Sequence, residues 1–490
     1  MHTHHRHQAS DLVHLAISAM SERGLEPEFS KQVERQLATI TGPGHETGAT
    51  IRDLTALLWC SIDNDDSLDL DQLTVCEVLE QGKVRMLVAI ADVDALVKKG
   101  TPIDEHARIN TTSVYTSARI FPMLPERLST DLTSLNPHED RLAVVTEMIF
   151  NADASLAGST VYRARVRNKA KLAYDAVSAW IEGQGDLPAA AATVAGMEAQ
   201  LRTQDALAQQ LRVRRHQEGS LELETFQPRA VFEGEQVIDI RQQEQNRARQ
   251  LIEEVMIATN GCSARFLASQ HSASLRRVVR SPERWLRIVG VAKEYGEELP
   301  NEPDGKALEA FLAKRHKADP LRFPDLSLII VKLMGRGEYV VETPGGEPIG
   351  HFGLAVRDYT HSTAPNRRYP DLITLRMVKA ALAKQSPPYS NTELGELAQH
   401  CTQQEDAAQK LERRMRKSEA ALLLESRVGQ QFDALVTGVT TEGVWVRLLT
   451  PPAEGKVVRG AMGMRLGDKV RVELVSTNVD RGFIDFVTVN

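Results

Sequence analysis

The chain has 490 residues, of which 42% are hydrophobic and 26% charged, and this composition is typical of a soluble globular protein with two to four domains. It excludes an integral membrane protein, because no apolar run approaches the roughly 18 residues that a membrane span needs. The N-terminus lacks the apolar segment of a signal peptide, and the four cysteines show no paired spacing. We therefore expect a cytoplasmic protein without membrane association, disulfides or a zinc site.

The formal net charge of −7 does not by itself indicate a nucleic-acid-binding protein, but the positive charges are unevenly distributed. Basic residues cluster at Arg212–Arg215, Arg276–Arg280, Arg367–Arg368 and Arg413–Lys417. Any one cluster taken alone fits a solvated helix face. An acidic protein can nevertheless contain a basic channel, because the local field at a cleft matters more than the total charge.

Hydrophobic spacing predicts two short amphipathic helices near the N-terminus, over Asp11–Arg23 and Glu28–Ile40. The turn-rich segment Thr41–Gly48 follows them and marks a boundary. We expect residues 1–50 to form a helical module. Two interpretations of it stay open: a helix-turn-helix-like unit for nucleic acid, or a cap that docks on the rest of the chain.

Five aspartates crowd into the stretch Ser61–Gln72, namely Asp63, Asp65, Asp66, Asp69 and Asp71. Carboxylates this close repel one another and stay ionised together only beside positive charge. A hard divalent cation such as Mg²⁺, with oxygen ligands, is the usual solution. Asp63, Asp65, Asp69 and Asp71 occupy odd positions, so an extended or lightly bulged strand would place them largely on one face.

Three interpretations compete for this stretch. A solvated acidic loop is the ordinary one. A calcium-binding loop that starts at Asp63 is excluded, because Leu68 stands where glycine is needed and Thr74 where a bidentate glutamate is needed. The apolar segments on both sides, Leu54–Cys60 and Thr74–Glu80, favour the third interpretation. In it, a buried strand delivers the carboxylates of a catalytic magnesium site into a cleft.

Mixed periodicity predicts that residues 51–385 form one domain of strands and helices. Strands are predicted over Val84–Val93, Arg141–Phe150, Gly158–Val166, Leu221–Phe232 and Gln236–Ile240, and helices over Ala173–Glu182, Asp186–Gln217, Arg247–Ser269 and Pro370–Leu382. The segment Thr111–Val145 is loop-rich and contains three prolines. Long ordered loops in a compact domain are usually functional, so we expect this one to contribute to a site.

The C-terminal part of the chain changes character twice. Residues 386–425 are charged and rich in alanine and glutamine, which predicts a helical connector. From Val428 onward the hydrophobic residues alternate, and a turn falls at Glu442–Gly443. This pattern predicts a small closed β-barrel of the OB-fold type over residues 426–490.

Several motifs, in this order, resemble the catalytic domain of the ribonuclease II / ribonuclease R family. They are SIDNDDSLDLDQ (61–72), VRMLVAIADVDALV (84–97), the segment TTSVY to SLNP (111–137), NRARQLIEEVMIATN (246–260) and HFGLAVRDYTHSTAPNRRYPDL (351–372). The C-terminal segment resembles the RNA-binding domain of the ribosomal-protein S-one type. Several long motifs in order are far more specific than one short pattern. The implied fold class is α+β, a mixed α/β ribonuclease II-type catalytic domain with a C-terminal OB-fold barrel.

The family that these motifs resemble hydrolyses single-stranded RNA processively from the 3′ end and releases nucleoside 5′-monophosphates. The resemblance therefore implies a monomeric 3′→5′ exoribonuclease whose partner is single-stranded RNA. It also implies one or two Mg²⁺ ions, for which Mn²⁺ can substitute.

The resemblance assigns the metal site and the catalytic carboxylates to Asp63, Asp69 and Asp71. The chain departs from the family at Gln72, where the motif carries a second adjacent aspartate. An amide oxygen can still ligate a hard cation, but it brings less charge, for which Asp65 or Asp66 could compensate. Arg367 matches the catalytic arginine that grips the reacting phosphate, because a guanidinium fork suits phosphate geometry.

Further residues match the family's RNA contacts. Tyr115 matches an aromatic residue that stacks on the 3′-terminal base. Tyr174 and Glu254 match residues that contact ribose hydroxyls, and Glu253 is the alternative because the helix register is open. Arg368 is expected to contact the RNA backbone or to be structural.

Two more segments carry candidate RNA contacts. Trp445 occupies the position of an aromatic in the barrel that could stack on a base, with Arg447 nearby for phosphate. Glu412 matches a glutamate near the cleft. For Tyr115 and Trp445, an ordinary place in the core is the alternative interpretation, and for Tyr174 and Glu254 it is an ordinary position on a helix surface.

The N-terminal part also departs from the family, which usually carries cold-shock-type barrels before the catalytic domain. Residues 1–50 are too short to encode them, so we expect a more open entry that admits partly structured RNA. The main alternative function is a catalytically impaired RNA-binding or regulatory protein on the same scaffold, disabled at Gln72. A DNA exonuclease is a more distant option.

Overall fold

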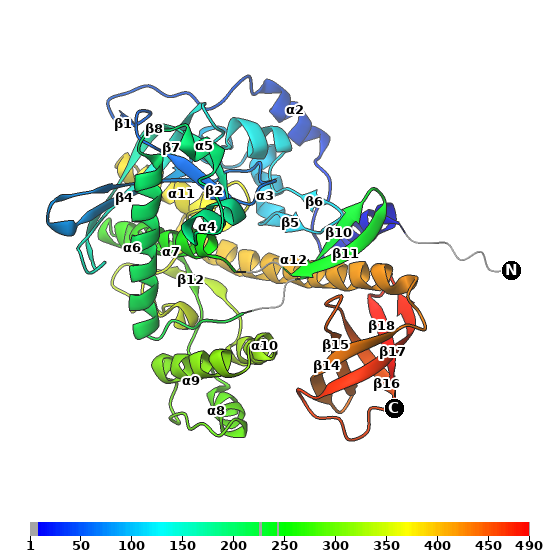
Figure 1. Cartoon of the computed structure of the whole chain (residues 1–490). Coiled ribbons are helices and arrows are strands. Elements are labelled where there is room, and N and C mark those ends of the chain that lie inside the picture. The colour runs from blue at the N-terminus through cyan, green and yellow to red at the C-terminus, as the bar shows by residue number, and fades with distance from the viewer. Residues whose placement is uncertain (1–7, 225–227, 243–244, 490) are drawn as a thin grey trace.

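The computed structural model describes residues 8–224, 228–242 and 245–489 (Figure 1). The first seven residues, and part of the strand predicted over Leu221–Phe232, lie outside the described residues. No helix in the described ranges is both long and apolar enough to cross a membrane.

A seven-stranded mixed sheet organises the region between residues 51 and 173, with the strand order β1-β8-β7-β4-β3-β2-β9. Its members are β1 (Ile51–Asp53), β2 (Cys60–Asp63), β3 (Gln72–Val78), β4 (Val84–Ala91), β7 (Asp140–Phe150), β8 (Leu156–Arg167) and β9 (Ala170–Ala173). The central strands pair antiparallel, whereas β1 joins β8 and β9 joins β2 in parallel. Both edge strands are short, which limits pairing with other chains.

Helices cover both faces of this sheet, and the alternation along β4 shows which residues face each layer. Leu87 and Ala89 belong to the core that includes residues of α3 (Pro102–Asn110) and α11 (Tyr369–Leu382). Met86 and Val88 belong to the opposite core, under α4 (Tyr174–Ile181), α6 (Met197–Gln217) and α7 (Arg247–Ser269). This period of two explains why β4 reads as a continuous apolar run.

Smaller elements surround the sheet. They are the helices α8 (Trp285–Glu294), α9 (Gly305–Ala318) and α10 (Phe323–Met334), and the strand pairs β5 (Val114–Tyr115) with β6 (Ile120–Phe121), β10 (Pro228–Glu233) with β11 (Gln236–Gln242), and β12 (Ser274–Val278) with β13 (Glu338–Glu342). The three helices share a separate small core that includes Trp285, Phe311 and Phe323.

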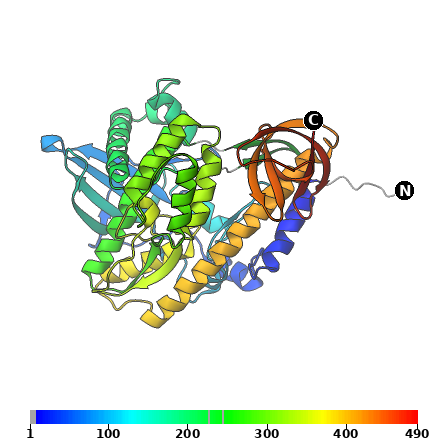
Figure 2. The same ribbon diagram turned by 90° about the horizontal axis from the view of Figure 1, so that it is seen from below.

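The predicted connector is one continuous helix of 35 residues, α12 (Asn391–Glu425), roughly 52 Å long. It contacts β12 and β13 near its start, and β10, β11, β17 and β18 further along. In Figure 1 it crosses the molecule, and Figure 2 shows that it continues past α1 to the C-terminal barrel. It therefore serves as a shared packing surface and not only as a linker.

The C-terminal barrel is closed, with the strand order β14-β15-β16-β18-β17. The strands are β14 (Gln431–Thr440), β15 (Gly443–Leu448), β16 (Glu454–Arg459), β17 (Lys469–Asn478) and β18 (Phe483–Thr488). This confirms the predicted OB-like barrel.

The N-terminal helices pack on different parts of the chain. The first, α1 (Ala9–Ser21), buries Leu12, Ala16 and Met20 in a core shared with α12 and the barrel. The second, α2 (Lys31–Thr39), contacts α3 and buries Val33 in the core of the sheet. This arrangement favours the docking interpretation over a helix-turn-helix-like unit.

Two predicted elements were wrong in detail. The helix predicted over Asp186–Gln217 is split into α5 (Ala189–Ala192) and α6, because Gly196 adopts a left-handed conformation with φ +84°. The strand predicted from Leu221 begins only at Pro228 among the described residues. By contrast, α7 covers the residues predicted for it.

Candidate active site

The aspartate-rich stretch is a loop between two strands, so the single extended strand expected there was wrong. β2 ends at Asp63, a turn follows, and β3 begins at Gln72. Cys60 pairs with Thr74, and their Sγ and Oγ1 atoms are 3.8 Å apart, so both side chains share a face. Side chains alternate between the two faces along a strand. Asp63 and Asp71 are each three residues away from the Cys60–Thr74 pair, so they lie together on the other face of the sheet.

Asp71 is the most buried of the five aspartates, with 1% of its surface exposed. Its Oδ1 accepts a hydrogen bond from the Asn366 backbone N at 2.9 Å, and its Oδ2 accepts one from Arg367 Nε at 3.2 Å. Burial raises the pKa of its carboxyl to about 7, although Arg367 lowers it, and Asp69 adds to the rise. The hydrogen bonds from Asn366 and Arg367 therefore do not fully offset the effect of burial, which disfavours the ionised carboxylate.

Asp63 and Asp69 complete the carboxylate cluster. Asp63 Oδ1 accepts a hydrogen bond from the Asn64 backbone N at 2.7 Å, and Asp69 Oδ1 accepts one from Ser67 Oγ at 3.3 Å. Burial raises the pKa of Asp63, Arg367 opposes that rise and Asp69 adds to it. Asp65 and Asp66, in contrast, are exposed in the turn.

Arg367 faces all three carboxylates from the loop that precedes α11. Burial lowers its pKa, but Asp71, Tyr115, Asp63 and Asp69 together raise it above the ordinary value. Its side chain is nevertheless 44% exposed, so part of the guanidinium remains open to a ligand.

Arg368 has a different environment from its neighbour. Its Nη2 lies 2.8 Å from Oδ1 of Asp371, a buried residue in the first turn of α11. The same oxygen accepts hydrogen bonds from the backbone N atoms of Thr363 and Ala364 at 2.8 Å. Arg368 thus stabilises the loop that carries Arg367. This geometry fits the structural role, which was one of the two roles expected for Arg368.

The two predicted RNA-contacting tyrosines lie near different carboxylates of the cluster. Burial raises the pKa of Tyr115 to about 12, with smaller contributions from Asp69 and Asp71 against that of Arg367. Burial, together with the nearby Asp63, also raises the pKa of Tyr174, the first residue of α4. The structure therefore brings both tyrosines to the carboxylate cluster.

The two candidate glutamates of α7 differ in surroundings. Glu254 is buried and its two oxygens bind Arg215 Nη2 and Nε at 2.6 and 2.8 Å. Glu253 is only partly buried, and burial raises its pKa. A carboxylate already held by a bidentate ion pair is poorly placed for ribose, so the geometry favours Glu253, the alternative that the helix register had left open. Ribose contact by either residue stays a prediction.

Arg249, on α7, is a residue that the sequence reasoning missed. Its Nη2 donates a hydrogen bond to Asn64 Oδ1 at 2.9 Å, and its guanidinium carbon lies 4.4 Å from the centre of the Tyr174 ring. It stands four residues before Glu253, so both share one helix face. This four-residue spacing from Glu253 was the signal in the sequence that could have identified Arg249.

In the barrel, Trp445 is partly exposed on β15 and pairs with Lys456 of β16, whose Nζ lies 5.6 Å from the ring centre. Arg447, expected to contact phosphate, is instead buried and bound to Asp325 of α10, with Nη2 and Oδ2 2.9 Å apart. It ties the barrel to the helices α8–α10.

Asp63, Asp69 and Asp71 have the chemistry that a divalent cation prefers, because their three carboxylates lie near Arg367 and carry more negative charge than its guanidinium balances. Gln72 is buried, and alternation places its side chain with Ile62, on the face opposite Asp71. The structure therefore does not bring Gln72 to the other three residues through its strand position. Metal ligation by Gln72 stays a prediction.

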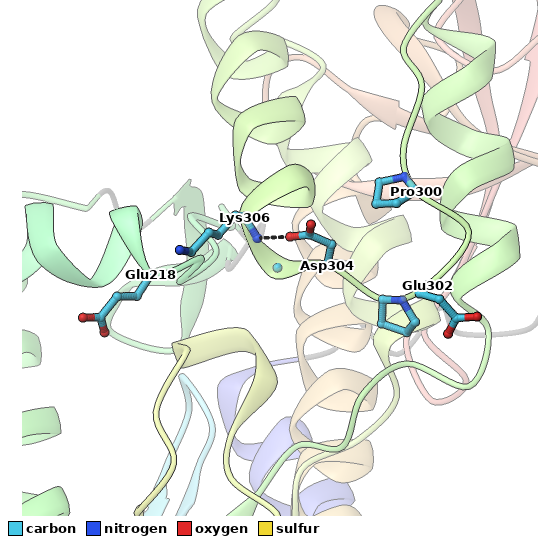
Figure 3. A pocket seen from close by; sticks show the side chains of 7 residues that line it. Glu218, Pro300, Glu302, Asp304 and Lys306 are labelled. Atoms are coloured by element: carbon cyan, nitrogen blue, oxygen red, sulfur yellow. Dashed lines mark hydrogen bonds between the residues drawn. The ribbon is translucent and has the colours of Figure 1, made fainter.

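A cavity of about 390 Å³ lies elsewhere, at the start of α9 (Figure 3). Its side chains include Glu218, Glu302, Asp304 and Lys306, and Asp304 caps the helix by accepting from the Lys306 backbone N at 2.9 Å. None of the residues that match the family's site line this cavity, so the carboxylate cluster remains the candidate active site.

Comparison with known proteins agrees with this geometry. The chain matches the RNB domain over residues 51–384 and the RNase II-type exonuclease C-terminal S1 domain over residues 430–489. It is 33% identical to Ribonuclease R of Escherichia coli K12 and 31% identical to Ribonuclease R of Vibrio cholerae, in each case over 94% of this chain. It spans 60% and 59% of those two relatives.

Solved structures show the same fold. The apo form of Mycoplasma genitalium RNase R aligns with a TM-score of 0.87 and 22% identity, over 98% of this chain and 78% of that one. Yeast Ssd1, a pseudonuclease, aligns with a TM-score of 0.69 and 16% identity, over 90% of this chain and 55% of that one. On the strength of the domain match over residues 51–384, the chain belongs to the RNB family, and it carries a C-terminal S1 domain of the RNase II type.

Proposed function

We propose that the chain is a magnesium-dependent 3′→5′ exoribonuclease that hydrolyses single-stranded RNA to nucleoside 5′-monophosphates. The observation that carries the proposal is the convergence of Asp63, Asp69 and Asp71 on Arg367 in a chain of the RNB family. Relatives named Ribonuclease R support the same activity. In a chain that had lost catalysis, nothing would require this costly cluster of buried charge to be kept.

Asp63, Asp69 and Asp71 would hold the metal, as one or two Mg²⁺ ions that Mn²⁺ can replace. When bound, a divalent ion lowers the pKa of a water molecule and offsets the charge on the departing oxygen. Asp71 is fixed for this role by Asn366 and Arg367, which orient its two oxygens. Gln72 would add at most a neutral ligand.

Arg367 would grip the phosphate that reacts. Its Nε is bound to Asp71, but a guanidinium has five N–H groups, and the half-exposed remainder can form a fork toward phosphate oxygens. The same groups would stabilise the negative charge that grows on the phosphate in the transition state.

Tyr115 and Tyr174 would seat the last nucleotide. A ring surface accepts any base, so stacking on Tyr115 fits hydrolysis without sequence preference. Contacts from Tyr174 and Glu253 to ribose hydroxyls would distinguish RNA from DNA. Binding should weaken with salt, because basic side chains along the strand release counterions from it.

We extend the proposal to the organisation of the chain. Residues 1–50 would form a helical docking module, 51–385 the catalytic domain, 386–425 the connector helix and 426–490 the RNA-binding barrel. Trp445 with Lys456 would stack on a base and neutralise a phosphate upstream of the site. The protein would act as a monomer in the cytoplasm.

The test is a 5′-labelled, unstructured RNA of about 30 nucleotides, long enough to span the barrel and the site. With Mg²⁺, we expect a descending series that ends at a short fragment. Chelator should abolish it, and so should Asp71→Asn, while Asp65→Asn at the exposed turn serves as a matched control. Intact RNA that remains bound in the presence of Mg²⁺ would refute the activity.

A further inference from the structure

The hairpin that carries Tyr115 is fastened to α12 at two points. Glu412 Oε1 accepts a hydrogen bond from the Tyr115 backbone N at 3.0 Å, and Glu419 Oε1 accepts one from the Ser117 backbone N at 3.1 Å. The Ser117 hydroxyl also donates to Glu419 Oε2 at 2.8 Å. Seven residues separate the two glutamates, so they lie about two turns apart on one face of the helix. The helix α12 thus binds the hairpin through the backbone N atoms on both sides of Thr116.

Glu419 is the more deeply buried of the two glutamates, with 1% of its surface exposed. Burial raises the pKa of its carboxyl, and the hydrogen bonds from Ser117 oppose that rise. A buried carboxylate is costly unless it is hydrogen-bonded, so the contacts with Ser117 stabilise it where it lies. The Ser117 hydroxyl in turn accepts a hydrogen bond from the Ala230 backbone N of β10 at 3.2 Å, which joins a third segment to the same point.

The barrel touches the same part of α12. Gly482, between β17 and β18, has φ +65°, and a Cβ there would lie 2.7 Å from Lys417 Cβ and 3.1 Å from the Ser418 backbone N. This turn of the barrel therefore packs directly on the two residues that precede Glu419. The barrel and the Tyr115 hairpin contact α12 within one helical turn of each other.

We propose that Glu419 is a positioning residue: through Ser117 it sets the pose of Tyr115 beside the carboxylates, and it links that pose to the docking of the barrel on α12. The inference rests on the proposed exoribonuclease function, because the pose of Tyr115 matters where a 3′-terminal base stacks on it. Loss of the contact should leave capture of RNA by the barrel intact and should weaken the seating of the last nucleotide.

The test uses the full chain with Glu419→Gln and Ser117→Ala, and with Glu396→Gln as control at an exposed position of the same helix. The probe is an RNA of about 20 nucleotides with 2-aminopurine at its 3′ end, bound in the presence of chelator. Stacking on Tyr115 quenches the fluorescence of 2-aminopurine. We expect the wild type and Glu396→Gln to quench. The other two variants should lose most of the quenching, and their affinity should fall by no more than one stacked base contributes, about fivefold to 150-fold.

With metal added, kcat should fall by about ten- to 100-fold in Glu419→Gln, because a displacement near 1 Å can cost that much. Circular dichroism and thermal unfolding establish that both variants are folded. Wild-type quenching in folded Glu419→Gln and Ser117→Ala would overturn the proposal. The quenching is read without hydrolysis, so a wild-type chain that quenches but releases no nucleotide would refute the proposed activity and leave the positioning role standing.

Discussion

Arg367 Nε donates a hydrogen bond to Asp71 Oδ2 across a separation of 296 residues in the sequence. The contact joins the start of β3 to the loop before α11, and the Asn366 backbone N closes it on the other carboxylate oxygen. Because Asp71 is buried, its contact with Arg367 affects whether the carboxyl is ionised and how its two oxygens are oriented. The behaviour of the site toward metal and protons follows from it.

A metal ion and a proton should compete at Asp71. Burial raises the pKa of Asp71 to about 7, so the carboxyl is partly protonated near neutral pH when no metal is bound. Metal ligands must be deprotonated, and affinity for Mg²⁺ or Mn²⁺ should therefore rise as the pH increases through about 7. Calorimetric titration with Mn²⁺ at pH 6 and pH 8 measures this, and Asp71→Asn should show a weaker and flatter dependence.

The same shift predicts an effect on stability in chelator. A carboxyl whose pKa is raised in the folded state is stabilising below its unfolded pKa of roughly 4, and that contribution is lost as the pH rises through about 7. At pH 8 without metal, Asp71→Asn should therefore equal or exceed the wild type in free energy of unfolding. A clearly less stable variant under these conditions would contradict the assigned environment of Asp71.

The two glutamates of α7 should have separable effects. Glu254→Gln breaks a buried bidentate ion pair with Arg215 and should cost about 3–5 kcal/mol in free energy of unfolding. Glu253→Gln should leave stability nearly unchanged and reduce discrimination against a 3′-terminal deoxyribose. Urea unfolding and competition by a 2′-deoxy-terminated strand measure the two effects. The reverse result would return the ribose role to Glu254.

An element or a site residue can be predicted from the sequence when the interactions that place it are formed by its neighbours along the chain. The helix α7 was predicted at its observed limits because its apolar spacing and the Asn246 cap lie within the helix itself. Asp63 and Asp71 were expected on one face of a single strand. They instead belong to two segments, and strand alternation puts them on one face of the sheet. The face of Gln72 depends instead on the register of Cys60 against Thr74, which no local pattern reveals.

The choice between Glu253 and Glu254 has the same origin. It depends on Arg215, whose position is set by α6, and the predicted helix did not include the turn at Gly196 after which α6 begins. Arg447 was misassigned for a similar reason, because its partner Asp325 belongs to a different part of the chain. Residue chemistry was readable from the sequence, whereas pairing between distant segments was not.

His216 should make stability depend on pH at the junction of α6 and α9. Its Nδ1 lies 3.2 Å from Glu309 Oε1 and 2.8 Å from the Ser220 carbonyl oxygen, and the bond to Glu309 raises its pKa. The charged form is therefore stabilising below the unfolded pKa near 6.5, and this contribution is lost as the pH rises through the folded value. Thermal unfolding should show that His216→Gln costs about 1 kcal/mol at pH 6 and less at pH 9.

Trp445 separates capture of RNA from its hydrolysis. Its ring is partly exposed beside Lys456 on the barrel, in a different domain from Asp71, so Trp445→Ala removes one stacking surface without touching the carboxylates. Base stacking on an aromatic residue contributes about 1–3 kcal/mol, which predicts a loss of affinity between about fivefold and 150-fold for RNA long enough to reach the barrel. A strand too short to reach it should bind and react as with the wild type. If both lengths are affected equally, Trp445 is a core residue of the barrel, and its replacement acts by unfolding that domain.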